Sequence, residues 1–249
     1  MSKAILITGG SRGIGRAAAV LAGRHGWSVA VNYVGNEAAA ADTVAQVTAA
    51  GGRAVAVQGD VAIEADVIAM FDATQNAFGR FDGLVNNAGI VALGQKLADM
   101  PAERLKRVFD TNVFGAYLCA REAARRMSRS AGGQGGAIVN LSSAAARLGS
   151  PNEYVDYAGS KAAIDAMTIG LSKELGPEGI RVNAIRPGLI DTEIHASSGS
   201  PDRAHRLASQ VPMGRPGTAE EVAQTIVWLL DETTSGYVNG AIIDVTGGR

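Results

Sequence analysis

Short apolar runs alternate with longer alanine-rich segments from one end of the chain to the other. The apolar runs are rich in β-branched residues and predict strands over residues 4–8, 28–33, 53–58, 83–86, 136–141, 181–186 and 241–245. The segments between them predict helices over residues 13–25, 36–50, 63–78, 101–129, 154–175 and 219–230. Because strands that alternate with helices form βαβ units, the pattern predicts a parallel sheet with helices on both faces.

The predicted strands are apolar at successive positions, as strands that are buried on both faces require. No internal repeat, low-complexity linker or break in composition divides residues 1–249. We therefore predict an α/β protein with one doubly wound domain.

Composition narrows the classes of partner. The 249 residues include 23 basic and 24 acidic side chains, so the net charge of −1 gives no reason to expect nucleic-acid binding. No apolar run approaches the roughly 20 residues of a membrane-spanning helix, and the N-terminal apolar run is too short for a signal peptide. The single cysteine, Cys119, excludes an internal disulfide bond and a multi-cysteine metal site. We expect a cytoplasmic protein with no metal centre.

A glycine-rich turn lies between the first predicted strand and the first predicted helix. Its spacing, G-x-x-x-G-x-G, differs from the commoner G-x-G-x-x-G, but a strand before it and a helix after it are the context of dinucleotide sites. Glycine lets the backbone approach a pyrophosphate, which binds at the N–H groups of the helix N-terminus. We predict that the cofactor contacts Gly9, Ser11, Arg12, Gly13, Ile14 and Gly15.

The end of the second predicted strand bears on the choice of cofactor. NAD sites usually place an acidic residue there to hold the ribose hydroxyls, whereas this strand ends in Asn32 and Tyr33. No carboxylate would repel a 2′-phosphate, and the Arg12 guanidinium in the glycine turn can bind one. The sequence therefore favours NADP(H) over NAD(H), with Asn32 and Tyr33 at the cofactor.

Small and polar residues follow four further predicted strands at their carboxyl ends, where open α/β sheets bind ligands. They are Asp60-Val61, Asn86-Asn87-Ala88-Gly89, Ser142-Ser143 and Pro187-Gly188-Leu189-Ile190-Asp191-Thr192. The Asp and Asn side chains also suit turns, and the two neighbouring asparagines suit contacts that join adjacent loops. Asn112 lies inside a predicted helix, where Asn has poor propensity, and predicts a polar network or a local kink.

Tyr157 and Lys161 stand four residues apart in a predicted helix, so both side chains reach one face. Such a pair is most often two surface residues. A cation beside a phenol, however, lowers the phenol pKa from its usual value of about 10 and favours proton transfer near neutral pH. The pair predicts a general acid/base if the neighbouring motifs share its site.

As a set, these motifs resemble the short-chain dehydrogenase/reductase family in its compact form of about 250 residues. The resemblance covers essentially the whole chain and is carried by Thr8-Gly9-x-x-x-Gly13-x-Gly15, Asn86-Asn87-Ala88-Gly89, Asn112, Ser143, Tyr157-x-x-x-Lys161 and Pro187-Gly188-x-x-x-Thr192. It implies a Rossmann-type domain with a seven-stranded parallel sheet. It also implies an oxidoreductase that interconverts a carbonyl and a secondary alcohol by hydride transfer with NAD(P).

The resemblance implies a role for each motif residue. Tyr157 would be the general acid/base, and Lys161 would lower its pKa and hold the nicotinamide ribose. Ser143 would bind the substrate oxygen, and Asn112 would anchor a water molecule that links Lys161 to solvent. Asp60 would bind the adenine amino group and Thr192 the carboxamide. Further cofactor contacts are expected at Val61, Asn86, Asn87, Ala88, Gly89, Pro187, Gly188 and Ile190.

Two features depart from the family pattern. Ser143 stands fourteen residues before Tyr157 instead of the usual thirteen or so, which a one-residue insertion in residues 147–156 explains; Ser142 is the alternative active-site serine. Glu178 precedes the glycine after the tyrosine helix, where reductases of acyl-carrier-protein substrates have a basic residue.

The chain resembles both 3-oxoacyl-carrier-protein reductases and bacterial glucose dehydrogenases, and the substrate stays open between such compounds. A cofactor-binding regulator without turnover is the alternative from another class; such proteins typically lose the Tyr or the Lys. We expect a substrate lid over about 189–212, with His195 and His205 solvated and not catalytic. The resemblance also implies a homotetramer.

Overall fold

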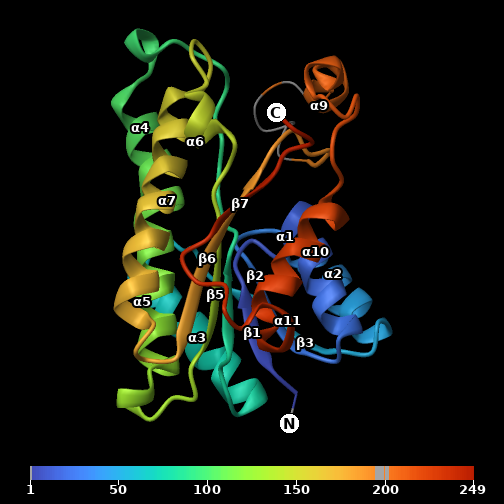
Figure 1. Cartoon of the computed structure of the whole chain (residues 1–249), viewed down its shortest axis with the longest axis vertical. Coiled ribbons are helices and arrows are strands. Elements are labelled where there is room, and N and C mark those ends of the chain that lie inside the picture. The colour runs from blue at the N-terminus through green and yellow to red at the C-terminus, as the bar shows by residue number, and fades with distance from the viewer. Residues whose placement is uncertain (1, 194–198, 200–201) are drawn as a thin grey trace.

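The computed structural model describes residues 2–193, 199 and 202–249. Its centre is one sheet of seven parallel strands in the order β3-β2-β1-β4-β5-β6-β7 (Figure 1). The strands are β1 (Ala4–Ile7), β2 (Ser28–Tyr33), β3 (Arg53–Gln58), β4 (Gly83–Asn86), β5 (Gly136–Leu141), β6 (Ile180–Pro187) and β7 (Ile242–Val245). The predicted doubly wound seven-stranded sheet is confirmed, and each predicted strand is present.

Helices cover both faces of this sheet. One face carries α1 (Gly13–Arg24), α2 (Glu37–Ala49) and α10 (Ala219–Leu230), and the other carries α3 (Glu64–Phe78), α5 (Gly115–Met127) and α7 (Val155–Leu175) (Figure 1). The shorter helices are α4 (Ala102–Phe109), α6 (Ala145–Leu148), α9 (Arg203–Arg206) and α11 (Glu232–Ser235). In the described part of the chain, no helix is long and apolar enough to cross a membrane.

Two hydrophobic cores explain the continuous apolar pattern of the strands. Ile5 and Ile7 pack with α1 and α10, whereas Leu6, between them, packs with α3 and α5 on the opposite face. All three side chains are at most 1% exposed. Successive residues of the central strands therefore contribute to opposite cores, whereas the edge strands β3 and β7 are less buried.

The helix predicted over 101–129 is interrupted. Residues Asp110–Phe114 form a π-helical turn, η2, between α4 and α5. Asn112 lies in this turn, is 1% exposed, and bonds both to the Ile90 backbone and to the Ser160 hydroxyl. The polar network expected at Asn112 is present, in a widened turn that interrupts the helix.

Candidate active site

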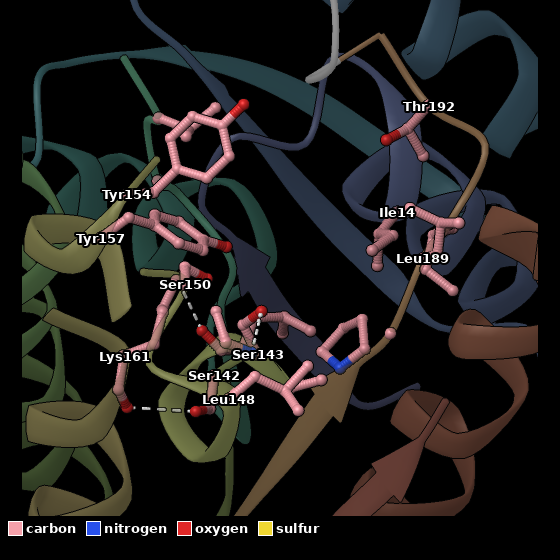
Figure 2. Close-up of a pocket in the computed structure, with 18 of the residues that line it drawn as sticks. Ile14, Ser142, Ser143, Leu148, Ser150, Tyr154, Tyr157, Lys161, Leu189 and Thr192 are labelled. Carbon is pink, nitrogen blue, oxygen red and sulfur yellow. Dashed lines mark hydrogen bonds between the residues drawn. The ribbon is translucent and has the colours of Figure 1, made fainter. Parts of the chain in front are cut away.

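A cavity of about 200 Å³ opens at the carboxyl edge of the sheet, between the start of α7 and the segment after β6. Figure 2 shows Tyr154, Tyr157, Ser143 and Lys161 on one side of it and Ile14, Leu189 and Thr192 on the other. The motif residues that line it are Ile14, Asn87, Gly89, Ser143, Tyr157, Lys161, Pro187, Gly188, Ile190 and Thr192. Residues from five separate motifs of the sequence thus meet at one place.

We distinguish two walls of this cavity. The turn wall consists of Ile14, Asn87, Gly89, Pro187, Gly188, Leu189, Ile190 and Thr192. The loop wall consists of Val91, Ala144, Ala145, Leu148, Ser150, Tyr154, Arg203 and Arg249. Tyr157, Ser143 and Lys161 line the space that the two walls share.

The turn wall is held by hydrogen bonds between the glycine turn and the end of β4. Asn87 Nδ2 donates to the carbonyl groups of Thr8 and Gly9, at 2.8 and 3.1 Å. Thr8 Oγ1 accepts from the backbone N–H groups of Asn87 and Ala88, both at 2.9 Å. Gly9 has a φ of +60°, and a Cβ there would lie 3.2 Å from Ala88 Cα. The positive φ of Gly9 and its close approach to Asn87 and Ala88 explain why this position of the turn needs glycine.

The side chain of Asn32 also holds this turn. Its Oδ1 accepts from the Gly9 N–H at 3.0 Å, and its Nδ2 donates to the Gly59 carbonyl at 2.9 Å. The residue is 1% exposed. The expectation that Asn32 hydrogen-bonds the cofactor is therefore corrected: a strand residue whose side chain points into the protein joins backbone segments and does not face a ligand.

The first turn of α1 has the character of an anion site. It contains no acidic residue, and its N-cap residue, Arg12, makes no side-chain capping hydrogen bond. In contrast, α2, α3, α4, α7 and α10 each have an acidic residue in the first turn. The positive end of the α1 dipole is thus left for an external anion, and these residues fit the pyrophosphate of a dinucleotide.

One carboxylate, that of Glu193, lies near the first turn of α1, and Asp60 belongs to the turn after β3. Glu193, just after Thr192, approaches the turn, because a Cβ built on Gly13 would lie 3.5 Å from Glu193 Oε2. Asp60 Oδ1 accepts from the Ala62 N–H at 2.9 Å, so this side chain acts as a turn former at the end of β3. Val61, next to it, is 4% exposed and contacts Gly115 of α5.

Arg12 and Tyr33 lie on the outer side of the turn and do not line the cavity. Arg12 is exposed and Tyr33 is half-buried at the end of β2. No acidic side chain forms a salt bridge with Arg12 within the described ranges. Ser11 contributes its carbonyl to Arg16 of α1, at 2.8 Å.

Tyr157 lies in the first turn of α7 and faces Ser143, which follows β5 by two residues. Burial raises the pKa of the Tyr157 phenol, and a hydrogen bond with Ser143 opposes this effect. The neighbouring Ser142 donates from Oγ to the Lys161 carbonyl at 3.1 Å and is 3% exposed. Of the two serines, Ser143 is thus the one beside the phenol.

Lys161 lies one turn further along α7 and is 4% exposed. Its Nζ donates to the Leu141 carbonyl at 2.7 Å and lies 5.7 Å from the centre of the Tyr157 ring. Burial lowers the pKa of Lys161 to about 8, although Asp165 raises it. We expected Lys161 to lower the Tyr157 pKa, but burial of the phenol has the larger effect and raises that pKa. The Lys161 ammonium bonds a backbone carbonyl instead of the phenol.

Asn112 stands beside this pair. A Cβ built on Gly89 would lie 3.3 Å from Lys161 Nζ and 3.4 Å from Asn112 Oδ1. The glycine at this position therefore lets β4, η2 and α7 meet, and it leaves the ammonium and the amide oxygen on either side of the same small space.

Leu148, Ser150, Tyr154 and Arg203 lie in residues 147–154 and 189–212, where we expected the substrate pocket, but sequence reasoning picked out none of them individually. Ser150 and Asn152 have φ values of +44° and +64°, in the left-handed region that non-glycine residues seldom adopt. This bent loop falls within the residues where the one-residue insertion was placed, and it brings Ser150 and Tyr154 to the cavity. Its serine, glycine and asparagine are a turn signal in the sequence. No local signal indicates Arg203 or Arg249.

The described residues of the expected lid border the cavity. Leu189, Ala204 and Val211 form a small buried cluster. Arg203 lines the loop wall, and Leu189 lines the turn wall. His205 is exposed, with its Nε2 3.0 Å from Asp191 Oδ2, in keeping with a solvated residue. His195 lies outside the described residues.

The fold and this site define a dinucleotide-binding α/β protein, and the comparisons give its family. Residues 9–249 match the family model described as enoyl-(acyl carrier protein) reductase. The chain is 54% identical over 244 residues to the uncharacterized oxidoreductase YgfF of Escherichia coli K12, with 98% of each chain covered. It is 39% identical to L-rhamnose 1-dehydrogenase (NAD(P)(+)) of Sphingomonas sp. SKA58, over 99% of this chain and 95% of the relative.

Among solved structures, the chain is similar to 3-ketoacyl-(acyl-carrier-protein) reductase from Brucella melitensis complexed with NADH. The TM-score is 0.91 at 31% identity, with 99% of this chain and 98% of the other covered. The chain belongs to the short-chain dehydrogenase/reductase family. It is accordingly an oxidoreductase that acts on the CH–OH group of a small molecule with a nicotinamide cofactor.

Proposed function

We propose that the protein interconverts a carbonyl compound and a secondary alcohol with NADP(H), and that Tyr157 is the general acid/base. The observation that carries the proposal is the meeting of Tyr157, Ser143 and Lys161 in a cavity whose other end is the glycine turn. Proton donors beside the reacting oxygen would stabilise the charge that develops there.

In the direction of reduction, the bound nicotinamide supplies a hydride to the carbonyl carbon. Tyr157 gives its phenolic proton to the carbonyl oxygen, so that one hydride and one proton yield the alcohol. Ser143 donates a hydrogen bond to the same oxygen and keeps it beside Tyr157. Lys161 places a positive charge near the phenolate that is left, which is where the hydrogen bond to Leu141 holds its ammonium. Asn112 would anchor the water that returns a proton.

The cofactor residues follow from the turn wall. The amides of Gly13, Ile14 and Gly15 would hold the pyrophosphate, and Thr192 would contact the carboxamide. Further contacts are proposed at Gly9, Ser11, Tyr33, Asp60, Val61, Asn87, Ala88, Gly89, Lys161, Pro187, Gly188 and Ile190. We propose NADP(H) over NAD(H) because Arg12 is exposed beside a β2 end without a carboxylate. The names of the relatives include both an NADH complex and NAD(P)(+).

An acyl-carrier-protein substrate is disfavoured by the charges beside the end of α7. Glu178 Oε2 accepts from the Ser130 N–H at 2.9 Å, so a carboxylate stands where a basic residue would attract an acidic carrier. Arg125, which could compensate, pairs with Glu122 at 2.7 Å. Arg129, whose Nε would lie 2.5 Å from a Cβ on Gly179, offsets the Glu178 carboxylate only in part. We therefore propose a free small molecule as the substrate.

We also propose a homotetramer. Four large side chains on α4, η2, α5 and α7 are 42–51% exposed although they are apolar: Phe109, Phe114, Tyr117 and Ile169. A shared interface would cover them. Light scattering on the purified protein tests this proposal, and a monomer at micromolar concentration would contradict it.

The experiment for the catalytic proposal is a carbonyl panel assayed by oxidation of NADPH and of NADH. The best substrate is then assayed with Tyr157→Phe and with Ser143→Ala. We expect kcat to fall by about 10²–10⁴-fold in Tyr157→Phe, since the proton donor is lost while the ring remains. Full activity of Tyr157→Phe would overturn the mechanism.

A further inference from the structure

The loop wall has a particular chemistry that bears on the substrate. Much of it is apolar: Val91, Ala144, Ala145 and Leu148, with the ring of Tyr154. Few of its uncharged side chains carry hydroxyl or amide groups, whereas a polyhydroxylated sugar needs several such partners to replace its hydration. The wall instead suits an apolar body, and its remaining polar groups include two guanidinium groups, those of Arg203 and Arg249.

The Arg203 guanidinium is already occupied. It binds both carboxylate oxygens of Glu153, at 3.0 and 2.6 Å, and its Cζ lies 5.2 Å from the centre of the Tyr154 ring. This bidentate pair joins α9 to the bent loop that carries Ser150. The charge of Arg203 is therefore largely balanced, and the contact serves to hold the two sides of the loop wall together.

The Arg249 guanidinium is placed differently. Its Nη2 contacts Gln210 Oε1 at 3.3 Å, and across residues 2–193, 199 and 202–249 no carboxylate forms a salt bridge with it. The residue is held in place, because its main-chain oxygen accepts a hydrogen bond from Arg147 Nη2 at 2.9 Å. A half-buried, anchored cation that lines a cavity without an acidic partner is a candidate binding group for an anion.

Other arginine side chains lie near Glu153 and Arg249. Arg203 is the main cause of the lowered pKa of Glu153, and the charges of Arg206 and Arg249 add to it. The positive charges of Arg203, Arg206 and Arg249 thus all act on the Glu153 carboxylate. A planar guanidinium such as that of Arg249 matches the two oxygens of a carboxylate.

We propose that the substrate is an apolar oxo acid or hydroxy acid, and that Arg249 binds its carboxylate while Tyr157 and Ser143 hold its reacting oxygen. This inference rests on the proposed function and extends it to the substrate class. Arg249 acts on binding, because it lies on the loop wall and the proton transfer occurs at Tyr157. Its loss should therefore raise KM more than it lowers kcat.

The test uses matched pairs of probes that differ only in charge. Phenyl- and alkyl-substituted 2-oxo and 4-oxo acids are assayed with NADPH beside their methyl esters, for the wild type, Arg249→Gln and Arg24→Gln. Arg24 is an exposed arginine of α1 that does not line the cavity, so its variant controls for the loss of one positive charge. A carboxylate that cannot be reduced, phenylacetate, is titrated calorimetrically beside phenylacetamide.

We expect the wild type to reduce at least one acid with kcat/KM about tenfold or more above that of its ester. Arg249→Gln should raise KM for the acid by about tenfold, change kcat by less than about threefold, and leave the ester unaffected. Arg24→Gln should behave as the wild type. Phenylacetate should bind the wild type better than phenylacetamide does and lose this advantage in Arg249→Gln.

The outcomes separate this inference from the proposed function. If the esters are reduced as well as the acids, and Tyr157→Phe abolishes both activities, the anionic substrate is wrong and the catalytic proposal stands. If Tyr157→Phe keeps full activity, the catalytic proposal itself fails. If no probe is reduced, calorimetry decides: equal binding of phenylacetate by the wild type and Arg249→Gln would overturn the role of Arg249.

Discussion

The two walls of the cavity are built by different means. The turn wall consists of residues within a few positions of the ends of β1, β4 and β6, and it is held by backbone contacts such as those of Thr8 and Asn87. The loop wall is assembled from loops and short helices away from these strand ends, and the ion pair Glu153–Arg203 joins two of them. Strand ends that the sequence marks position the first wall, whereas the second depends on how the longer segments fold back. The turn wall, which carries the proposed cofactor contacts, and the loop wall, which carries the proposed substrate contacts, are thus built by different parts of the fold.

The largest expected effect on the free energy of unfolding concerns the close packing behind the turn wall. A Cβ at Gly15 of α1 would lie 2.5 Å from the Gly9 carbonyl oxygen and 2.6 Å from Asn87 Nδ2. We expect Gly15→Ala to lower the free energy of unfolding by about 2–3 kcal/mol, as measured by urea denaturation. The matched control is Gly170→Ala in α7, where a Cβ meets nothing within 4 Å. This substitution should stabilise the helix by about 0.5–1 kcal/mol. Equal changes in the free energy of unfolding for Gly15→Ala and Gly170→Ala would contradict the close approach of Gly15 to Gly9 and Asn87.

The second prediction concerns the ammonium between the two walls. Because burial lowers the Lys161 pKa to about 8 from 10.5, the folded state binds fewer protons than the unfolded state between these pH values. Below pH 8 the charged ammonium is buried, and the free energy of unfolding is lowered by its full desolvation cost. The free energy of unfolding then rises between pH 8 and 10.5. From pH 8 to 9.5, the wild type should gain about 2 kcal/mol relative to Lys161→Met in urea unfolding without cofactor. A pH-independent difference between the two proteins would show that Lys161 is not buried as described.

A smaller effect is expected at the outer side of the turn wall. Arg12→Ala should weaken NADPH binding by about tenfold, the value of one charge-assisted hydrogen bond, and should change NADH binding by less than about twofold. Fluorescence titration with both cofactors measures this. Equal affinities of the wild type for NADPH and NADH would contradict the proposed preference.

The smallest effect concerns the segment that joins the two walls. Glu193 approaches Gly13 at the positive end of α1, where the proposed pyrophosphate would bind. Glu193→Gln should therefore tighten NADPH binding by about two- to fivefold, which is the range of a single charge at a helix terminus. Weaker binding in this variant would mean that the carboxylate supports the site instead of competing for it.

Much of the fold could be predicted from the sequence, because two-sided burial makes each strand a continuous apolar run and β-branched residues mark it. The turn wall was predictable for a related reason: its glycines and asparagines come at strand ends, where open α/β sheets bind ligands. The role of Asn32 was mistaken, since its residue type does not tell which way the side chain points from the strand. Arg203 and Arg249 carried no signal, because their place in the cavity depends on a bent loop and on segments far away in the chain.

The most direct test of the central claim measures chemistry and cofactor binding on one preparation of Tyr157→Phe. Single-turnover reduction of the best carbonyl substrate gives the rate of hydride transfer, and fluorescence titration gives the Kd for NADPH. The account predicts that the rate falls by about 10²–10⁴-fold while the Kd stays within about twofold of the wild-type value, because the phenolic proton is used only in the reaction. A wild-type rate, or a loss of rate explained fully by weaker cofactor binding, would contradict the role of Tyr157 as the proton donor.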